Sequence, residues 1–233
     1  MRSGDGRIIA AVNEARAEAT KEEVDREGGG ADRVRRFDLA RTIALSDGVF
    51  AFALTLLVLS ITVPVLKGAV TSEDVASALF DRGQELVSWV VSFLVIGGFW
   101  MRHNALSRRL ERVDSRFLVL NLAFLALIAF IPYPTEVMGK YPTTASFVFY
   151  ATVISLLIIV SAAGAGYASA AGLLRSPESP AERRYRFMSA FLPTFFFVSS
   201  IPVALLFGRS AGYLCWIALI PANAIYDRLS KSA

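Results

Sequence analysis

The stretch Arg41–Pro64, RTIALSDGVFAFALTLLVLSITVP, decides the fold of this chain. From Val49 to Val63 it carries no charge, whereas its first turns contain an aspartate, Asp47. An apolar run of about 20 residues is long enough to cross the hydrocarbon core of a bilayer as a helix. Ionisable groups at the edge of such a span are costly and by default mark a functional site with a partner nearby. The stretch therefore predicts a membrane-spanning helix with a polar cluster at one end.

The composition of the whole chain agrees with a membrane protein. Of its 233 residues, 55% are hydrophobic and only 19% are charged, which is too apolar for an ordinary soluble domain. The net charge of +4 is small, and no basic patch interleaved with exposed aromatic residues indicates a nucleic-acid partner. A single cysteine, Cys215, and a single histidine, His103, exclude an intrachain disulfide and a multi-histidine metal site.

Catalytic signatures are absent from the sequence. There is no HExxH, GxSxG or GxxxxGK[ST] pattern, and His103 has no nucleophile in a defined arrangement with it. We therefore expect a protein that is not an enzyme, with no catalytic residue, no cofactor and no bound metal.

Six apolar segments predict an all-α polytopic membrane protein with six transmembrane helices. They cover roughly residues 42–64, 86–100, 117–133, 144–174, 187–208 and 213–226. Pro132 and Pro134 are expected to end the third segment, and Pro193 and Pro202 to kink the fifth.

Polar segments flank the predicted transmembrane domain, which we place at residues 37–228. Residues 1–36 alternate basic and acidic side chains and are expected to form a cytoplasmic tail, either as a solvated helix or as unstructured chain. Residues 229–233 are expected to be a short cytoplasmic C-terminal tail.

The loops between the apolar segments differ in their content of basic residues. Arginines are concentrated in residues 33–41, 102–116 and 175–186, and two more bases follow the sixth segment. The basic residues of the alternate loops are only Lys67, Arg82, Lys140 and Arg209. Because basic loops stay on the cytoplasmic side, we expect a multi-pass protein of the cell inner (plasma) membrane with both termini in the cytoplasm.

The first predicted helix has one almost wholly apolar stripe. At about 100° per residue, Phe52, Thr55, Leu56 and Leu59 fall on the same face. From the residues alone, this face has two interpretations: it contacts lipid or neighbouring helices, or it lines a pore.

A polar cluster is predicted where the first two helices share the same depth. Ser46 and Asp47 lie near the cytoplasmic end of the first helix, and Trp100 and His103 are three apart on the last turn of the second. We expect Arg41 to converge with these four residues. An Asp–Arg or an Asp–His bridge then neutralises Asp47, and the indole N–H supplies a further donor. The cluster is either a structural clasp or part of the gating machinery.

These two motifs resemble those of a known family. Arg41-x-x-x-Leu45-Ser46-Asp47 is similar to the first-helix signature Arg-x-x-x-Phe-Ser-Asp of the transmembrane protein 175 family of potassium channels, with leucine in place of the usual phenylalanine. Phe99-Trp100-x-x-His103 resembles the second-helix motif of that family. A single six-helix repeat per chain is similar to the bacterial branch, which assembles as homotetramers.

The resemblance implies a function and assigns roles to the residues above. It implies a potassium-permeable channel, weakly selective over sodium, in which the first helices of four subunits line the pore for monovalent cations. Phe52, Leu56 and Leu59 then form the hydrophobic constriction, with Thr55 as a hydroxyl layer among them. Members of the family usually carry isoleucine or leucine where Phe52 stands. The carbonyl filter sequence TVGYG of ordinary potassium channels is indeed absent.

Three other classes of membrane protein are alternatives to a channel. A secondary transporter for a small ion or solute is the main alternative, but transporters typically show internal repeats and a polar site at the midplane, where this first helix is apolar. A membrane-embedded enzyme has no clustered ionisable groups apart from those near Asp47. A purely structural membrane protein surrounded by lipids stays open.

Overall fold

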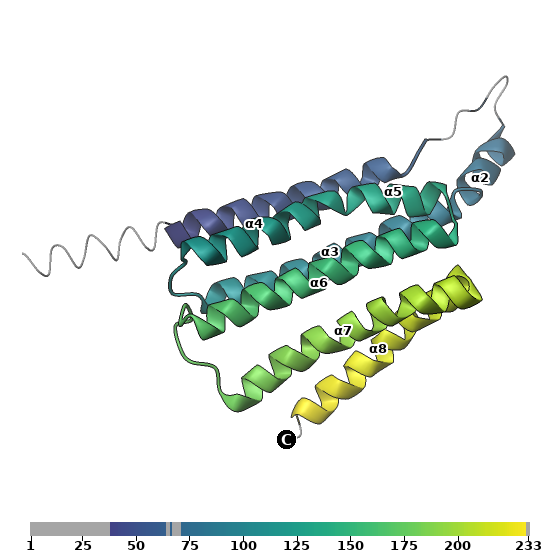
Figure 1. Cartoon of the computed structure of the whole chain (residues 1–233). Coiled ribbons are helices and arrows are strands. Elements are labelled where there is room, and N and C mark those ends of the chain that lie inside the picture. The colour runs from purple at the N-terminus through teal and green to yellow at the C-terminus, as the bar shows by residue number, and fades with distance from the viewer. Residues whose placement is uncertain (1–37, 64–65, 67–70, 232–233) are drawn as a thin grey trace, which may run out of the picture.

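A computed structural model describes residues 38–63, 66 and 71–231, and every regular element in these ranges is a helix (Figure 1). The predicted all-α class is thus confirmed. The predicted tail 1–36, and the last two residues of the predicted C-terminal tail, lie outside the described residues.

The structure contains one 3-10 turn and eight helices, counted over the described residues. The first helix covers Asp38–Ser60 and ends in a 3-10 turn, η1, at Leu57–Ser60. The others are α2 Ser72–Phe80, α3 Gly83–Arg109, α4 Ser115–Phe130, α5 Pro132–Lys140, α6 Thr144–Ala170, α7 Pro180–Phe207 and α8 Arg209–Lys231.

Five stretches of the described chain are long and apolar enough to cross a membrane. They are the first helix, α3, the combined stretch Ser115–Lys140, α6 and α7. Five of the six predicted segments are therefore confirmed as candidate spans, and the chain is a multi-pass membrane protein. The sixth predicted segment forms α8, which is a helix but does not belong to these five.

The helices form a layered bundle (Figure 1). The first helix lies beside α4 and α5, α3 and α6 form the middle, and α7 and α8 make a hairpin along the other side. Successive long helices run in opposite directions, so that the start of the first helix and the end of α8 lie at the same end of the bundle.

Several boundaries differ from the sequence prediction; α7, for example, begins at Pro180 and not at the predicted Phe187. Pro132 and Pro134 do not end the third segment: α5 begins at Pro132 directly after α4 and continues to Lys140. A proline in the first turn of a helix is tolerated because the N–H that it lacks has no partner there anyway. Helix α3 continues nine residues past the predicted end at Trp100, because the hydropathy of the sequence marks the lipid-facing part of a helix and not its polar extension.

Helix α2 was not predicted. Its start carries a capping box in which the Thr71 side chain accepts from the backbone N–H of Asp74 and the Asp74 carboxylate accepts from the backbone N–H of Thr71. This Thr-x-x-Asp spacing was the available sequence signal.

The core of the bundle lies where the first helix, α3, α4 and α6 meet. The first helix contributes Phe50, Ala53 and Leu57 to it, all almost fully buried. Their partners from the other three helices include Ile96, Phe99, Phe124, Ile128, Tyr150 and Leu157. The first helix is therefore fixed to the bundle along one side.

Candidate functional site

One face of the first helix is buried in its own protomer. The buried residues recur at alternating spacings of four and three, at Ser46, Phe50, Ala53, Leu57 and Ser60. This is the spacing of a single helical stripe, and it faces α3, α4 and α6. This buried stripe was not predicted from the sequence.

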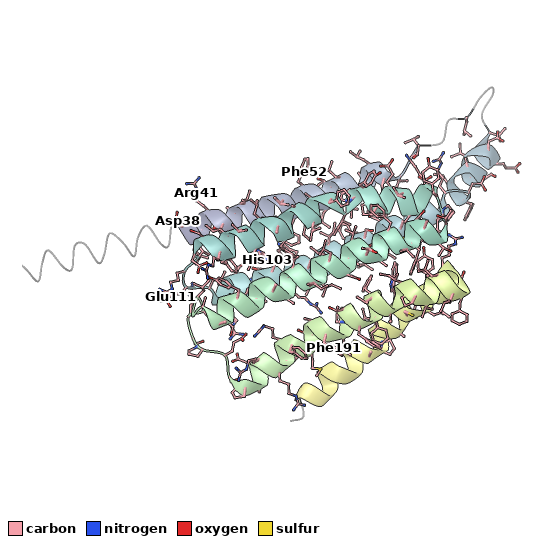
Figure 2. The ribbon with its side chains drawn as sticks, in the orientation of Figure 1. Asp38, Arg41, Phe52, His103, Glu111 and Phe191 are labelled. Atoms are coloured by element: carbon pink, nitrogen blue, oxygen red, sulfur yellow. The ribbon has the colours of Figure 1, made fainter. Side chains whose placement is uncertain are left out.

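The opposite face is open and repeats with the same spacing. Its members share high exposure and the register of a seven-residue repeat: Arg41, Leu45, Gly48, Phe52, Thr55 and Leu59. Phe52 is 62% exposed and Leu59 is 72% exposed, although both are large and apolar. Figure 2 shows Phe52 on the outer side of the helix, away from the bundle. Leu56, which was predicted to share this stripe, is half-buried beside it.

The hydroxyl of Thr55 is turned back on its own helix. Its Oγ1 donates to the carbonyl oxygen of Phe52 at 2.8 Å. The hydroxyl proton is therefore occupied, and the lone pairs of Oγ1 are the atoms that this exposed position offers. Such a group accepts from water or contacts a cation.

Asp47 is paired with the second long helix. The indole Nε1 of Trp100 on α3 donates to Asp47 Oδ1 at 3.1 Å, as the sequence analysis expected. Asp47 also lies close enough to His103 for an electrostatic interaction. Three of the five predicted cluster residues thus gather at one place.

Ser46 lies on the buried face and bonds to a residue that the sequence analysis missed. Its Oγ donates to the carbonyl of Thr42 at 2.9 Å and accepts from Nδ2 of Asn121 at 3.2 Å. Asn121 belongs to α4 and is buried. The available signal was a lone amide inside an apolar segment, since a polar side chain at membrane depth needs a partner.

His103 is enclosed by aromatic rings. Its imidazole stacks on Phe124 of α4 with the ring centroids 5.4 Å apart, and the ring of Phe50 lies 5.7 Å away. His103 therefore links α3 with both the first helix and α4 through packing, as well as lying beside Asp47.

Arg41 takes a different direction. Figure 2 shows its side chain at the start of the first helix, pointing away from the bundle, whereas His103 lies among the helices. Its participation in the cluster stays a prediction.

The chain is similar in sequence to known proteins. Residues 41–132 match the model of the family described as the endosomal/lysosomal potassium channel TMEM175. A protein of Streptomyces collinus named as a potassium channel is 41% identical over 101 residues, which are 43% of this chain and 48% of the relative. A potassium channel of Chamaesiphon minutus is 36% identical over 104 residues, which are 45% of this chain and 51% of the relative.

A solved structure has the same fold. The crystal structure of a homologue from Chamaesiphon minutus, described as a lysosomal potassium-selective channel TMEM175 homologue, matches with a TM-score of 0.65. The sequence identity is 24%, and the match covers 78% of this chain and 95% of that chain.

These matches confirm the resemblance inferred from the two motifs, both of which lie within residues 41–132. The chain spans about half the length of the curated relatives that it matches. Those relatives are named channels, so neither an enzyme nor a transporter gains support from them. Over residues 41–132 this chain is therefore similar to the TMEM175 family.

Proposed function

We propose that this chain is a potassium-permeable cation channel of the TMEM175 family, weakly selective for potassium over sodium and assembled as a homotetramer. The open stripe of the first helix is the observation that carries the proposal. A protomer that buries one face of this helix leaves the other, with large apolar side chains, uncovered. The seven-residue register of that face suits the packing of copies of one helix around a shared axis. The two bacterial relatives named as potassium channels support the choice of ion.

The constriction in this proposal is apolar. Phe52, Leu56 and Leu59 from four copies narrow the axis, and a narrow apolar passage sheds water and imposes a desolvation cost on an ion. Thr55 adds a layer of hydroxyl oxygens, whose lone pairs contact the partly dehydrated ion. Potassium is favoured because it gives up its hydration more readily than sodium, so the preference is modest.

The polar cluster sets the position of the first helix. Trp100 holds Asp47, and Asn121 holds Ser46, so the first helix is tied to α3 and α4 by two hydrogen bonds at the same end. A small rotation of the first helix that changes the width of the constriction has to stretch or break both hydrogen bonds. In this proposal Ser46, Asp47, Trp100 and Asn121 form a clasp that stabilises one position of the first helix.

The topology follows from the even number of long helices. We place the protein in the cell inner (plasma) membrane with α8 as the sixth span. Both termini then lie in the cytoplasm, at the arginine-rich end of the bundle. The alternating helix directions in Figure 1 support this arrangement.

Flux through proteoliposomes tests the proposal. Purified full-length protein in potassium-loaded liposomes is expected to release potassium down its gradient at channel rates, with sodium slower. Protein-free liposomes and liposomes with heat-inactivated protein are the controls. Release that saturates at low turnover, or that requires a counter-transported solute, contradicts a channel.

A further inference from the structure

A large cavity lies behind the clasp, on the side of the bundle away from the open stripe. Its volume is about 910 Å³, and its walls come from α3, α4, α6 and the start of α7. It is located at the end of the bundle where the α3–α4 and α6–α7 connections meet. There the backbone N–H of Glu111 donates to the carbonyl of Leu173, and that of Arg175 to the carbonyl of Arg109, both at 2.9 Å. These bonds fix the two connections to each other beside the cavity.

The inner wall of the cavity is apolar. Phe99, Leu106, Phe124, Ile158 and Val160 line it. Gly164 lies on the same wall, and a Cβ built on it meets no atom within 4 Å. The space is therefore open, and it is lined by groups that favour a hydrocarbon chain over water.

Charged side chains of predominantly one sign line the same cavity. Four arginines and two glutamates contribute to it: Arg102, Arg109, Arg184, Arg186, Glu178 and Glu182. The arginines exceed the acids by two. A cavity with an apolar wall and surplus guanidinium groups matches a ligand with an apolar body and an anionic head.

The two acids are already paired, which leaves a cation for the ligand. The Glu178 carboxylate, only 5% exposed, accepts from Arg186 at 3.1 Å and from Ser169 at 2.8 Å, and Arg109 lies 3.6 Å from it. Glu182 lies 3.3 Å from Arg109. None of the ion pairs formed among the described residues involves Arg184, which is exposed on the first turns of α7.

We propose that this cavity binds an anionic phospholipid, with an acyl chain against the apolar wall and the headgroup phosphate at the arginines. Basic pockets between transmembrane helices on the cytoplasmic side are suited to such headgroups, and the arginine-rich end of this bundle is the end expected to be cytoplasmic. A soluble anion leaves the apolar wall uncovered. A zwitterionic lipid covers the wall but leaves the surplus positive charge unmatched.

The position of the cavity gives the lipid a route to the clasp. His103 and Asn121 line it, and these residues contact Phe50 and Ser46 of the first helix on their other sides. An occupied cavity therefore supports the side chains that fix the first helix. This consequence rests on the proposed function, whereas lipid binding itself does not.

Lipid binding is measured on the purified full-length protein, independently of ion flux. We expect native mass spectrometry of detergent-solubilised protein to show tighter binding of phosphatidylglycerol than of phosphatidylcholine with the same acyl chains. Arg184→Gln should lower phosphatidylglycerol affinity about fivefold, since one basic residue near an anionic headgroup contributes about that factor. Arg183→Gln, its exposed neighbour outside the cavity, is the matched control and should leave the affinity unchanged.

A second pair of variants tests the apolar part. Gly164→Leu fills the open space and should abolish the bound lipid, whereas Ala163→Leu, on the exposed side of the same helix, should not. Equal affinities for the two lipids, equal effects of the two arginine variants, or lipid retained in Gly164→Leu would each overturn the proposal. Displacement of the lipid by inorganic phosphate alone would overturn it too, because it would assign the site to a free anion.

Discussion

The two faces of the first helix carry similar side chains and have opposite surroundings. Phe50 and Leu57 are 1% and 0% exposed, whereas Phe52 and Leu59, two residues further along in each case, are 62% and 72% exposed. Both faces are apolar, so hydrophobicity does not distinguish them. The two faces differ in their partners. The buried face packs against other helices of the same protomer, whereas the open face is available for contacts outside the protomer. Substitutions on the buried face should therefore act on folding, and those on the open face on conduction.

The largest effect is expected from Phe50→Ala. Removing a buried aromatic ring typically lowers the free energy of unfolding by about 3–5 kcal/mol, and this ring also contacts His103 and Phe124. Denaturant unfolding of the purified protein in detergent measures the change. Phe52→Ala is the matched control and should leave protomer unfolding nearly unchanged. Similar losses for both variants would remove the distinction between the two faces.

The next effect concerns conduction. Leu59→Asn replaces an apolar group of the open stripe by an amide that holds water, so we expect potassium flux through liposomes to rise about tenfold, which corresponds to a barrier lowered by about 1.4 kcal/mol. Val58→Asn, at the adjacent exposed position outside the stripe, is the control. An increase in both variants would point to general disruption of the helix, and unchanged flux in Leu59→Asn would contradict the apolar constriction.

A smaller effect is expected where the buried face is tied to α4. Asn121→Leu removes the donor to Ser46, and a hydrogen bond between membrane helices contributes about 1 kcal/mol to the free energy of unfolding. Ser155→Ala is the control, because this buried hydroxyl donates to the carbonyl of Ala151 in its own helix. The loss should be seen in Asn121→Leu and be near zero in the control. The reverse order would show that the clasp does not stabilise the helix position.

The smallest effect is a pH dependence of stability, at the end of the buried face where the first helix begins. There Leu39 packs in a cluster with Phe117, whose backbone N–H donates to the Asp114 carboxylate at 2.8 Å. This bond, together with one from the Tyr167 hydroxyl, lowers the pKa of Asp114 below its ordinary value of 3.8. A lowered pKa in the folded state stabilises the protein above the unfolded pKa, and this contribution is lost as the pH falls through the folded value.

The measurement is thermal unfolding in detergent between pH 5 and pH 2. The wild-type protein should lose stability below about pH 4, and Asp114→Asn should show a weaker dependence in that range. Identical pH profiles would indicate that this cap does not contribute.

The sequence was sufficient for the long apolar helices and the pairing of Asp47 with Trp100, because hydropathy and helical spacing are local properties. It was not sufficient for Asn121, whose role depends on which helix α4 packs against. It also misplaced the end of the third segment, since Pro132 and Pro134 fall in a first turn where proline is tolerated. The cavity could not be predicted at all, because its wall combines residues from four helices whose relative positions only the folded chain defines.

Access to the open stripe from water tests the central claim most directly. In a Cys215→Ser background, Thr55→Cys should react with a charged, water-soluble methanethiosulfonate reagent, and potassium flux through liposomes should fall as it reacts. Leu118→Cys on α4, also exposed in the protomer but outside the stripe, should leave flux unchanged. A Thr55→Cys thiol that reacts only with lipid-soluble reagents and leaves flux intact would contradict the assignment of this face to the conduction pathway.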